Sequence, residues 1–191
     1  MKLVLASTSA FRRQLLERLQ LPYETDSPEV DETPLPNEDA KQMVIRLAAA
    51  KSRAVAHRHP HALIIGSDQS AELDGHKLTK PGGYEKAFMQ LRQASGKHIV
   101  FHTGLCLLNS DTDKIQTACI DYTVVFRNLS DIQINAYLQR EQPWDCAGSF
   151  KSEALGIALF ERVEGDDPTA LIGLPLIKLV SMLQQEGMSV L

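Results

Sequence analysis

Two long stretches rich in β-branched and aromatic residues constrain the fold of this chain most. Residues 97–108 and 114–126 are both rich in Val, Ile, Thr and Phe, the residue types that favour strands. Only residues 109–113 separate them. The sequence therefore predicts a long antiparallel hairpin, and any fold assigned to the chain must place that hairpin in a sheet.

Elsewhere the chain alternates apolar runs with amphipathic segments. K-L-V-L-A at 2–6 is apolar after Lys2, and residues 62–66 are continuously apolar, as expected of buried strands. Short strands are also predicted around Tyr23 and over 157–163, and a hairpin is predicted across Asp74-Gly75. Helices are predicted from an N-cap at Ser9 to before Pro22, from a cap at Asn37 to about Val55, over 84–94, over 130–140, and around Pro175.

Strand–helix units combined with one antiparallel hairpin predict an α/β fold, of the mixed α+β kind, around a mixed sheet. No internal repeat, linker or low-complexity segment divides the sequence, so we expect one domain over residues 1–191. The hydrophobic content of 43% in 191 residues is enough for a sizeable core.

The charge balance excludes some classes of partner. Twenty Lys and Arg against 24 Asp and Glu give a net charge of −4, which provides no broad basic surface for a long nucleic acid. No apolar stretch approaches the roughly 20 residues that a membrane span needs. The three cysteines form no C-x-x-C pair, which argues against a disulfide framework and a zinc knuckle. With no signal-peptide pattern at the start, we expect a cytoplasmic protein with reduced thiols.

The first candidate site is S-T-S-A-F-R-R at residues 7–13, where a predicted strand turns into a helix. Backbone N–H groups at a helix N-terminus, hydroxyl groups and two arginines all favour a bound anion. Arg12 shares a helical face with Leu15, Leu16 and Leu19, so we expect it to point toward the protein body. The alternative is an ordinary amphipathic helix with solvated arginines.

Three further segments carry candidate groups. Lys51 shares a helical face with four apolar residues, so it either extends to solvent or reaches an anion. Asp68, in G-S-D-Q at 66–69, follows the apolar strand, where a carboxylate suits general-base or metal chemistry; the alternative is a turn cap. Glu32 lies in a proline-rich loop at 28–36, where a solvated carboxylate is the alternative.

Two other segments are less informative. In the segment 146–153, small residues allow close backbone approach, and Lys151 and Glu153 carry opposite charges. His57, His59 and His61 could chelate a metal, but their place between a predicted helix and strand favours an exposed loop.

Taken together, these motifs resemble the Maf family of nucleoside triphosphate pyrophosphatases over nearly the whole chain. One departure is Ala10, where the family usually has proline. The matching landmarks are L-A-S-T-S-A-F-R-R at 5–13, V-D-E at 30–32, A-A-A-K at 48–51, G-S-D-Q at 66–69, K-P at 80–81, S-G at 95–96, T-G at 103–104 and A-G-S-F-K-S-E-A-L-G at 147–156.

The resemblance implies a fold similar to that of inosine triphosphate pyrophosphatases, with a mixed sheet and two lobes flanking a central cleft. It implies hydrolysis of a small nucleotide between its α and β phosphates, giving a nucleoside monophosphate and pyrophosphate. It also suggests a homodimer. The phosphate-contacting positions of the family match Ser7, Ser9, Arg12, Arg13, Lys51 and Lys80.

The same resemblance assigns the reacting groups. Asp68 matches the proton acceptor, and Glu32 with Asp68 would hold a divalent cation, Mg²⁺ or Mn²⁺. A coordinated carboxylate is a poor base, so the two roles of Asp68 compete, and the sequence leaves both open.

Three positions indicate which nucleobase the substrate contains. Many relatives have Arg, Thr and Gln at the positions of Phe11, Gln69 and Glu153 and are associated with dTTP and UTP. The set present here resembles the subfamily that hydrolyses 7-methyl-GTP, although that subfamily more typically has Trp at the position of Phe11. Glu153 can accept the paired N–H donors of guanine, and Phe11 can offer a cationic purine a cation–π contact of about 0.5–2 kcal/mol.

We therefore expect a pyrophosphatase that acts on 7-methyl-GTP by metal-assisted attack of water on the α-phosphorus. Two alternatives stay open: a dTTP and UTP pyrophosphatase of the same family, and a non-catalytic nucleotide-sensing regulator of cell division.

Overall fold

The computed structural model describes residues 1–191 as two compact units, each assembled from separate stretches of chain. The strands β3 (Ala62–Leu73), β5 (His98–Asn109) and β6 (Lys114–Phe126) run through both units. That the chain forms one domain stays a prediction. The first unit comprises Met1–Gln69, His102–Ile120 and Asp167–Leu191, and the second comprises Ser70–Phe101 and Asp121–Asp166.

Parallel pairing defines the sheet of the first unit. Strand β1 (Lys2–Ala6) pairs in parallel with β2 (Glu24–Asp26) on one side and with β3 on the other. The sheet continues in the order β2-β1-β3-β5-β6. Because Leu5 is in register with Ile65, the residues that follow β1 lie level with the G-S-D-Q segment of β3.

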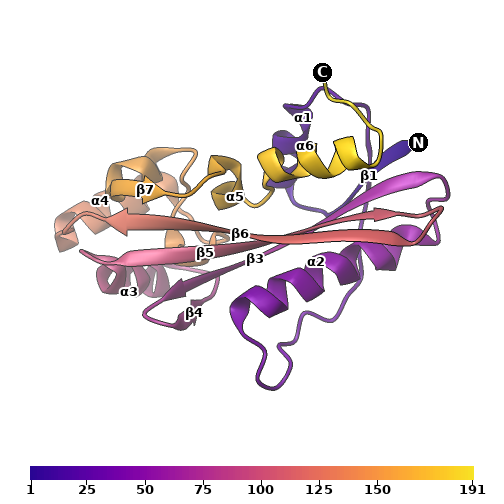
Figure 1. Cartoon of the computed structure of the whole chain (residues 1–191). Helices are drawn as coiled ribbons and strands as arrows, with labels where there is room; N and C mark the ends of the chain where they lie inside the picture. The colour runs from indigo at the N-terminus through magenta and orange to yellow at the C-terminus, as the bar shows by residue number, and fades with distance from the viewer. The chain divides into compact units, whose positions relative to one another are not determined.

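Helices cover both faces of this sheet. Figure 1 shows α2 (Ala40–Ala56) on one face and α6 (Leu176–Gln185) on the other. Alternate side chains of the strands point to opposite faces, so each face has its own buried cluster. The α2 face contains Val4, Ala6, Ala48, Val55, Ala62, Ile64, Cys106 and Leu108. The other face, with α1 (Ala10–Glu17) and α6, contains Leu3, Leu5, Leu15, Leu16, Leu63, Ile65, Leu105, Leu107, Leu174, Leu176, Leu179, Met182 and Leu183.

The second unit contains the end of β3, the start of β5 and the end of β6. Here β4 (His76–Leu78) pairs with β3, and β7 (Phe160–Glu164) pairs antiparallel with β6. Helices α3 (Tyr84–Ala94) and α4 (Asp131–Glu141) pack against each other, and two 3₁₀ turns follow, Ala147–Ser149 and Leu155–Leu159. Its core contains edge-to-face rings with centroids 5.0–5.5 Å apart: Phe101, Phe126, Phe150 and Phe160.

This architecture confirms the predicted mixed α/β fold and its long hairpin, since β5 and β6 are neighbours joined by a four-residue turn. The helix predicted over 84–94 has those bounds. Asp74 and Gly75 form the β3–β4 turn, and both have positive φ angles. All three cysteines are free thiols, and no helix combines the length and apolar character needed to cross a membrane.

Two predicted strands have different limits. β3 continues to Leu73 instead of ending near Gly66, because its second half finds a new partner in β4. The strand predicted over 157–163 begins only at Phe160, since a 3₁₀ turn occupies the residues before it.

Two helix predictions also need correction. Asp39, not Asn37, caps α2: its side chain accepts from the N–H of Gln42, whose side chain returns a bond to the Asp39 backbone. Asn37 has a φ of 60° and belongs to the preceding turn.

The C-terminal helix is two helices, α5 (Pro168–Ile172) and α6. Pro175 lacks the N–H needed to continue a helix, and Gly173 has a φ of 122°. Asp167 joins the two helices, since its carboxylate caps α5 and also accepts from the N–H of Ile177 in α6.

Helix α2 contacts the sheet directly because two strand positions lack side chains. A Cβ at Gly66 would lie 2.1 Å from the carbonyl oxygen of Ala48, and one at Gly104 would lie 2.1 Å from that of Val44. The helix backbone therefore rests on β3 and β5, which sets how far any side chain of α2 reaches over the sheet.

We predict that Gly66→Ala lowers the free energy of unfolding by about 1–3 kcal/mol, because the new methyl group must displace the backbone of α2. Urea denaturation measures this loss. Gly83→Ala is the matched control, since a Cβ there meets no atom within 4 Å and the backbone is extended. Equal stability of the two variants would contradict the close approach of α2.

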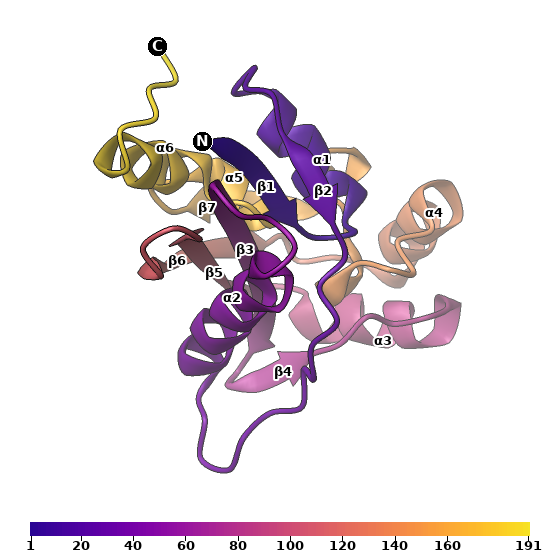
Figure 2. The same ribbon diagram turned by 90° about the vertical axis from the view of Figure 1, so that its right-hand side faces the viewer.

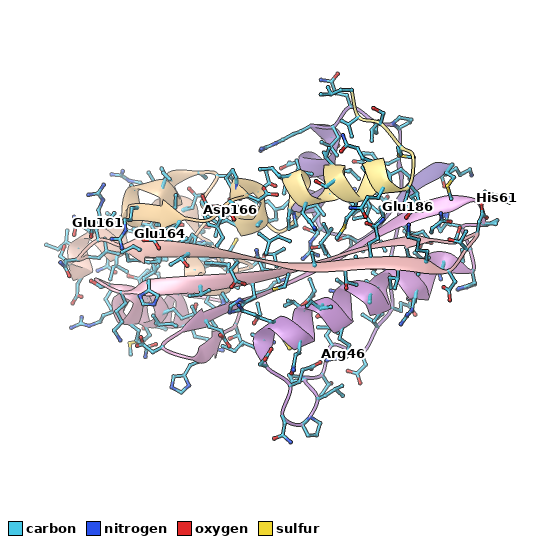
Figure 3. All side chains as sticks on the ribbon, viewed as in Figure 1. Arg46, His61, Glu161, Glu164, Asp166 and Glu186 are labelled. Carbon is cyan, nitrogen blue, oxygen red and sulfur yellow. The ribbon has the colours of Figure 1, made fainter.

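A nearly buried carboxylate fastens α6 to the β5–β6 hairpin. Glu186, at the end of α6, accepts from the side-chain amides of Asn109 and Gln116, both at 2.9 Å, and pairs with Lys114 at 2.8 Å. Figure 3 places its label between α6 and the hairpin. The hydrogen bond from Asn109, followed by the bond and charge of Lys114, lowers the pKa of Glu186.

We predict that Glu186→Ala lowers the free energy of unfolding at pH 7 by about 1–3 kcal/mol, because it leaves two amides without their acceptor. The pKa of Glu186 is lower in the folded state than in the unfolded state, so its stabilisation is present above the unfolded pKa and disappears as pH falls. The difference from wild type should therefore shrink below about pH 4 in urea titrations. The exposed neighbour Gln185, replaced by Ala, serves as the control. A difference that stays constant with pH would contradict the role of the ionised carboxylate.

Candidate active site

A buried lysine lies between two acidic side chains in the first unit. The Nζ atom of Lys51 donates to Oδ1 of Asp68 at 2.6 Å and pairs with Oε1 of Glu32 at 2.7 Å. Lys51 and Asp68 are 7% and 8% exposed, whereas the Glu32 side chain is 60% exposed. Of the two alternatives for Lys51, the structure therefore has it reaching carboxylates rather than extending to solvent.

The G-S-D-Q segment lies inside β3, not at its end, so its side chains alternate between the two faces of the sheet. Asp68 faces α2 and meets Lys51. Ser67 and Gln69 face α5 instead. The Ser67 hydroxyl donates to the Gly173 carbonyl at 2.9 Å, and the Gln69 amide donates to the Ala170 carbonyl at 2.8 Å. Asp68 caps no turn here, because the strand continues on both sides of it.

The start of α1 has the predicted cap. The Ser9 hydroxyl accepts from the N–H of Arg12, and the Ser7 hydroxyl accepts from the N–H of Ser9 at 3.1 Å. The first turn of α1 contains no acidic residue, so no carboxylate of this turn offsets the positive end of the helix dipole. Phe11 is exposed on this turn, with 38% of its surface accessible.

Arg12 points into the unit as its helical face predicted. Its Nε donates to the Gly173 carbonyl at 2.8 Å, the same oxygen that Ser67 contacts. Burial lowers the pKa of Arg12, and the charges of Asp68 and Glu32 partly offset that effect. The guanidinium is therefore close enough to sense the same two carboxylates as Lys51. Arg13 is exposed, and the structure brings it to neither carboxylate.

Two of the predicted site residues belong to the second unit. Lys80 and Glu153 are both exposed, and Glu153 accepts from the hydroxyl of Ser152 at 3.2 Å. Burial chiefly raises the pKa of the Cys146 thiol; the charge of Glu153 adds to this increase, while Lys151 and Lys80 oppose it. Lys80 and Glu153 therefore both lie near one thiol within this unit.

The segments that carry these two residues are firmly held. The Gln90 amide donates to the Thr79 carbonyl at 2.9 Å, which fixes the chain before Lys80. On the other segment, the Lys151 ammonium donates to the Glu141 carbonyl at 3.0 Å. Lys151, singled out in the sequence with Glu153, is thus engaged in holding the loop.

Sequence reasoning missed the residues that hold α5 in place. Ser67 and Thr103 are fully buried, and their hydroxyls donate to the carbonyls of Gly173 and Ala170, both at 2.9 Å. The available signal was a hydroxyl residue, Ser67 or Thr103, inside a buried strand. It could not identify the acceptors, because these lie 106 and 67 positions further along the chain.

Glu32 and Asp68 are the groups that could hold a divalent cation. Their carboxylate oxygens approach the same ammonium within 3 Å, so the two are close together. Hard oxygen donors of this kind suit Mg²⁺ and Mn²⁺, and the donor set therefore fits such an ion. That these residues hold one stays a prediction.

Comparison with known proteins shows which family this chain resembles. The family model described as Maf-like protein matches residues 2–186. The 7-methyl-GTP pyrophosphatase of Thiobacillus denitrificans is 57% identical over 99% of this chain and 94% of its own length. That of Pseudomonas aeruginosa is 53% identical over 98% of both chains.

The structure of the Staphylococcus aureus Ham1 protein superposes with a TM-score of 0.51 at 15% identity, covering 97% of this chain and all of that one. The two proteins therefore share a fold. Given the match across nearly its whole length and the identity to curated relatives, the chain belongs to the Maf-like family.

Proposed function

We propose that this protein is a nucleoside triphosphate pyrophosphatase that hydrolyses 7-methyl-GTP to 7-methyl-GMP and pyrophosphate. The observation that carries the proposal is the buried Lys51–Asp68 pair, with Glu32 on the same ammonium and Arg12 within electrostatic range of both carboxylates. Charged groups of both signs are thereby concentrated in one small region of a nearly neutral chain, as phosphoryl chemistry requires.

Asp68 is the group that orients or deprotonates the attacking water. The Lys51 ammonium, 2.6 Å from its Oδ1, holds the orientation of the carboxylate. The second oxygen of Asp68 remains for a water molecule or a cation. Attack of that water on the α-phosphorus breaks the bond to the bridging oxygen, and the electron pair leaves with pyrophosphate.

The cationic residues and hydroxyls hold the triphosphate. We assign this role to Ser7, Ser9, Arg12, Arg13, Lys51 and Lys80, as the family resemblance implies. Arg12 has the strongest support among them, because its Nε is fixed on the Gly173 carbonyl and its Nη groups stay available for phosphate oxygens.

Glu32 and Asp68 would hold Mg²⁺ or Mn²⁺ together with phosphate oxygens. Such an ion neutralises charge that develops on those oxygens during bond cleavage. With two carboxylates against Lys51 and Arg12, the residues alone are already close to neutral. A bound cation then adds the positive charge that a triphosphate needs.

Phe11 and Glu153 supply the preference for a methylated guanine. Phe11 is exposed, so its ring face is available to a cationic purine. Glu153 offers acceptor oxygens for the N1–H and N2–H₂ donors. Gln69 has a different role. Its amide donates to the carbonyls of Ala170 and Leu171, so it influences nucleobase recognition through the position of α5.

We predict that Asp68→Asn lowers kcat for pyrophosphate release at least about 100-fold, because the amide cannot take a proton. The amide oxygen can still accept from Lys51, and Glu32 still pairs with the ammonium, so the variant should fold, with a lower thermal unfolding temperature because the buried pair loses one charge. Asp113→Asn is the matched control, since Asp113 lies in the exposed β5–β6 turn with a φ of 55° that Asn tolerates. Wild-type turnover by Asp68→Asn would refute the assignment, and nucleotide binding without turnover by the wild type would favour a sensor.

We predict that Glu153→Gln lowers the kcat/KM ratio of 7-methyl-GTP over UTP by about tenfold, equivalent to about 1.4 kcal/mol. Glutamine replaces one acceptor oxygen by a donor, which opposes guanine and suits uracil. Competition assays with both nucleotides measure the ratio directly. The exposed Glu161, changed to Gln, should leave it unaltered. An unchanged ratio in Glu153→Gln would remove Glu153 from base recognition.

A further inference from the structure

The loop that carries Glu32 is long, polar and exposed. It runs over residues 27–39, from the end of β2 to the cap of α2, and Figure 2 shows it as an extended connection. Pro28, Pro34 and Pro36 stiffen it, and Pro34 and Pro36 are exposed. An exposed carboxylate on such a loop can meet Lys51 only if something fixes the loop against α2.

One fastening lies at the start of the loop. The guanidinium of Arg58, just beyond α2, donates to both carboxylate oxygens of Asp26, at 2.8 and 3.0 Å, and to the Ser27 carbonyl at 3.2 Å. His59 contacts the same carboxylate at 2.7 Å. This cluster fixes the end of β2, but it lies six residues before Glu32.

A second fastening lies next to Glu32. Arg46 projects from α2 toward the loop, where Figure 3 labels it. Its guanidinium donates to the Thr33 carbonyl at 3.2 Å, one residue after Glu32, and forms two bonds to Glu38, at 2.5 and 2.7 Å. Glu38 in turn accepts from the N–H of Leu35 at 3.0 Å. One arginine thus joins the loop at both sides of its proline turn.

We propose that Arg46 is a positioning residue that places Glu32 beside Asp68 by holding the loop to the helix that carries Lys51. The inference rests on the proposed function. Arg46 and Lys51 belong to the same rigid helix, so the Thr33 carbonyl and the Glu32 carboxylate are both set by α2. The hydrogen bonds of Arg46 run to Thr33 and Glu38, so its effect on the position of Glu32 passes through the loop backbone, although its charge also reaches Asp68.

The pair is suited to this role over a wide pH range. Arg46 lowers the pKa of Glu38 to about 2, so the carboxylate stays ionised under ordinary conditions. The two parallel bonds fix direction as well as distance, which an ammonium group cannot do. Because the Arg46 side chain is partly exposed, the pair contributes little to global stability, and its loss should act locally.

The test compares Arg46→Ala with Arg53→Ala. Arg53 lies two turns further along α2 on the same face, is exposed and pairs with no carboxylate. In Arg46→Ala, the concentration of Mg²⁺ for half-maximal pyrophosphate release should rise about tenfold, with kcat at saturating Mg²⁺ within about twofold of wild type. Arg46→Lys should recover only part of the loss, because a single ammonium cannot replace the paired bonds.

Two readouts do not depend on turnover. Amide hydrogen exchange over residues 27–39 should accelerate in Arg46→Ala and stay at the wild-type rate in Arg53→Ala. Mn²⁺ binding, followed by electron paramagnetic resonance, should weaken by the same factor as the Mg²⁺ dependence. Unchanged exchange, or faster exchange with unchanged Mn²⁺ affinity, would overturn the role of Arg46. If the wild type hydrolyses no nucleotide, the proposed function is wrong. The role of Arg46 would still be decided by hydrogen exchange and Mn²⁺ binding.

Discussion

The contact of Lys51 with Asp68 and Glu32 brings together the candidate catalytic groups of the first unit. A buried ammonium must be paired, and Asp68, nearly as buried, meets the same requirement. Three features of the fold bring Lys51 and the two carboxylates together. Gly66 and Gly104 let α2 rest on the sheet, the cap at Asp39 fixes where the helix begins, and the loop from β2 brings Glu32 to the ammonium.

Successive side chains of β3 point to opposite faces of the sheet, so neighbouring residues have different roles. Asp68 points to α2 and its lysine, whereas Ser67 and Gln69 point to the opposite face and hold carbonyls of α5 and the residue after it. Arg12 reaches the Gly173 carbonyl from α1. The Gly173 turn therefore links the helix that begins at the candidate phosphate site to the strand that carries Asp68.

Much of this could be predicted from the sequence, and what could not has a physical reason. A continuous apolar run located β1, and β-branched and aromatic composition located the long hairpin, because these strands are buried along most of their length. The apolar stripe of Leu15 and Leu16 located α1. The sequence pattern did not predict element ends that depend on tertiary contacts or on special backbone angles. β3 continues past Gly66 because β4 pairs with its end, and the C-terminal helix is interrupted between Gly173 and Pro175. The apolar face of α2 indicated that Lys51 was unusual, and the Arg12 face indicated its direction. Arg46 gave no such signal, since its partners are a backbone carbonyl and a glutamate that only the loop conformation brings near.

We propose that water attacks the α-phosphorus of 7-methyl-GTP beside the Lys51–Asp68 pair. Hydrolysis in ¹⁸O-labelled water, followed by mass spectrometry of the separated products, shows which phosphorus is attacked. One ¹⁸O atom should enter 7-methyl-GMP and none should enter pyrophosphate. Label in pyrophosphate, or release of 7-methyl-GDP and inorganic phosphate, would contradict it.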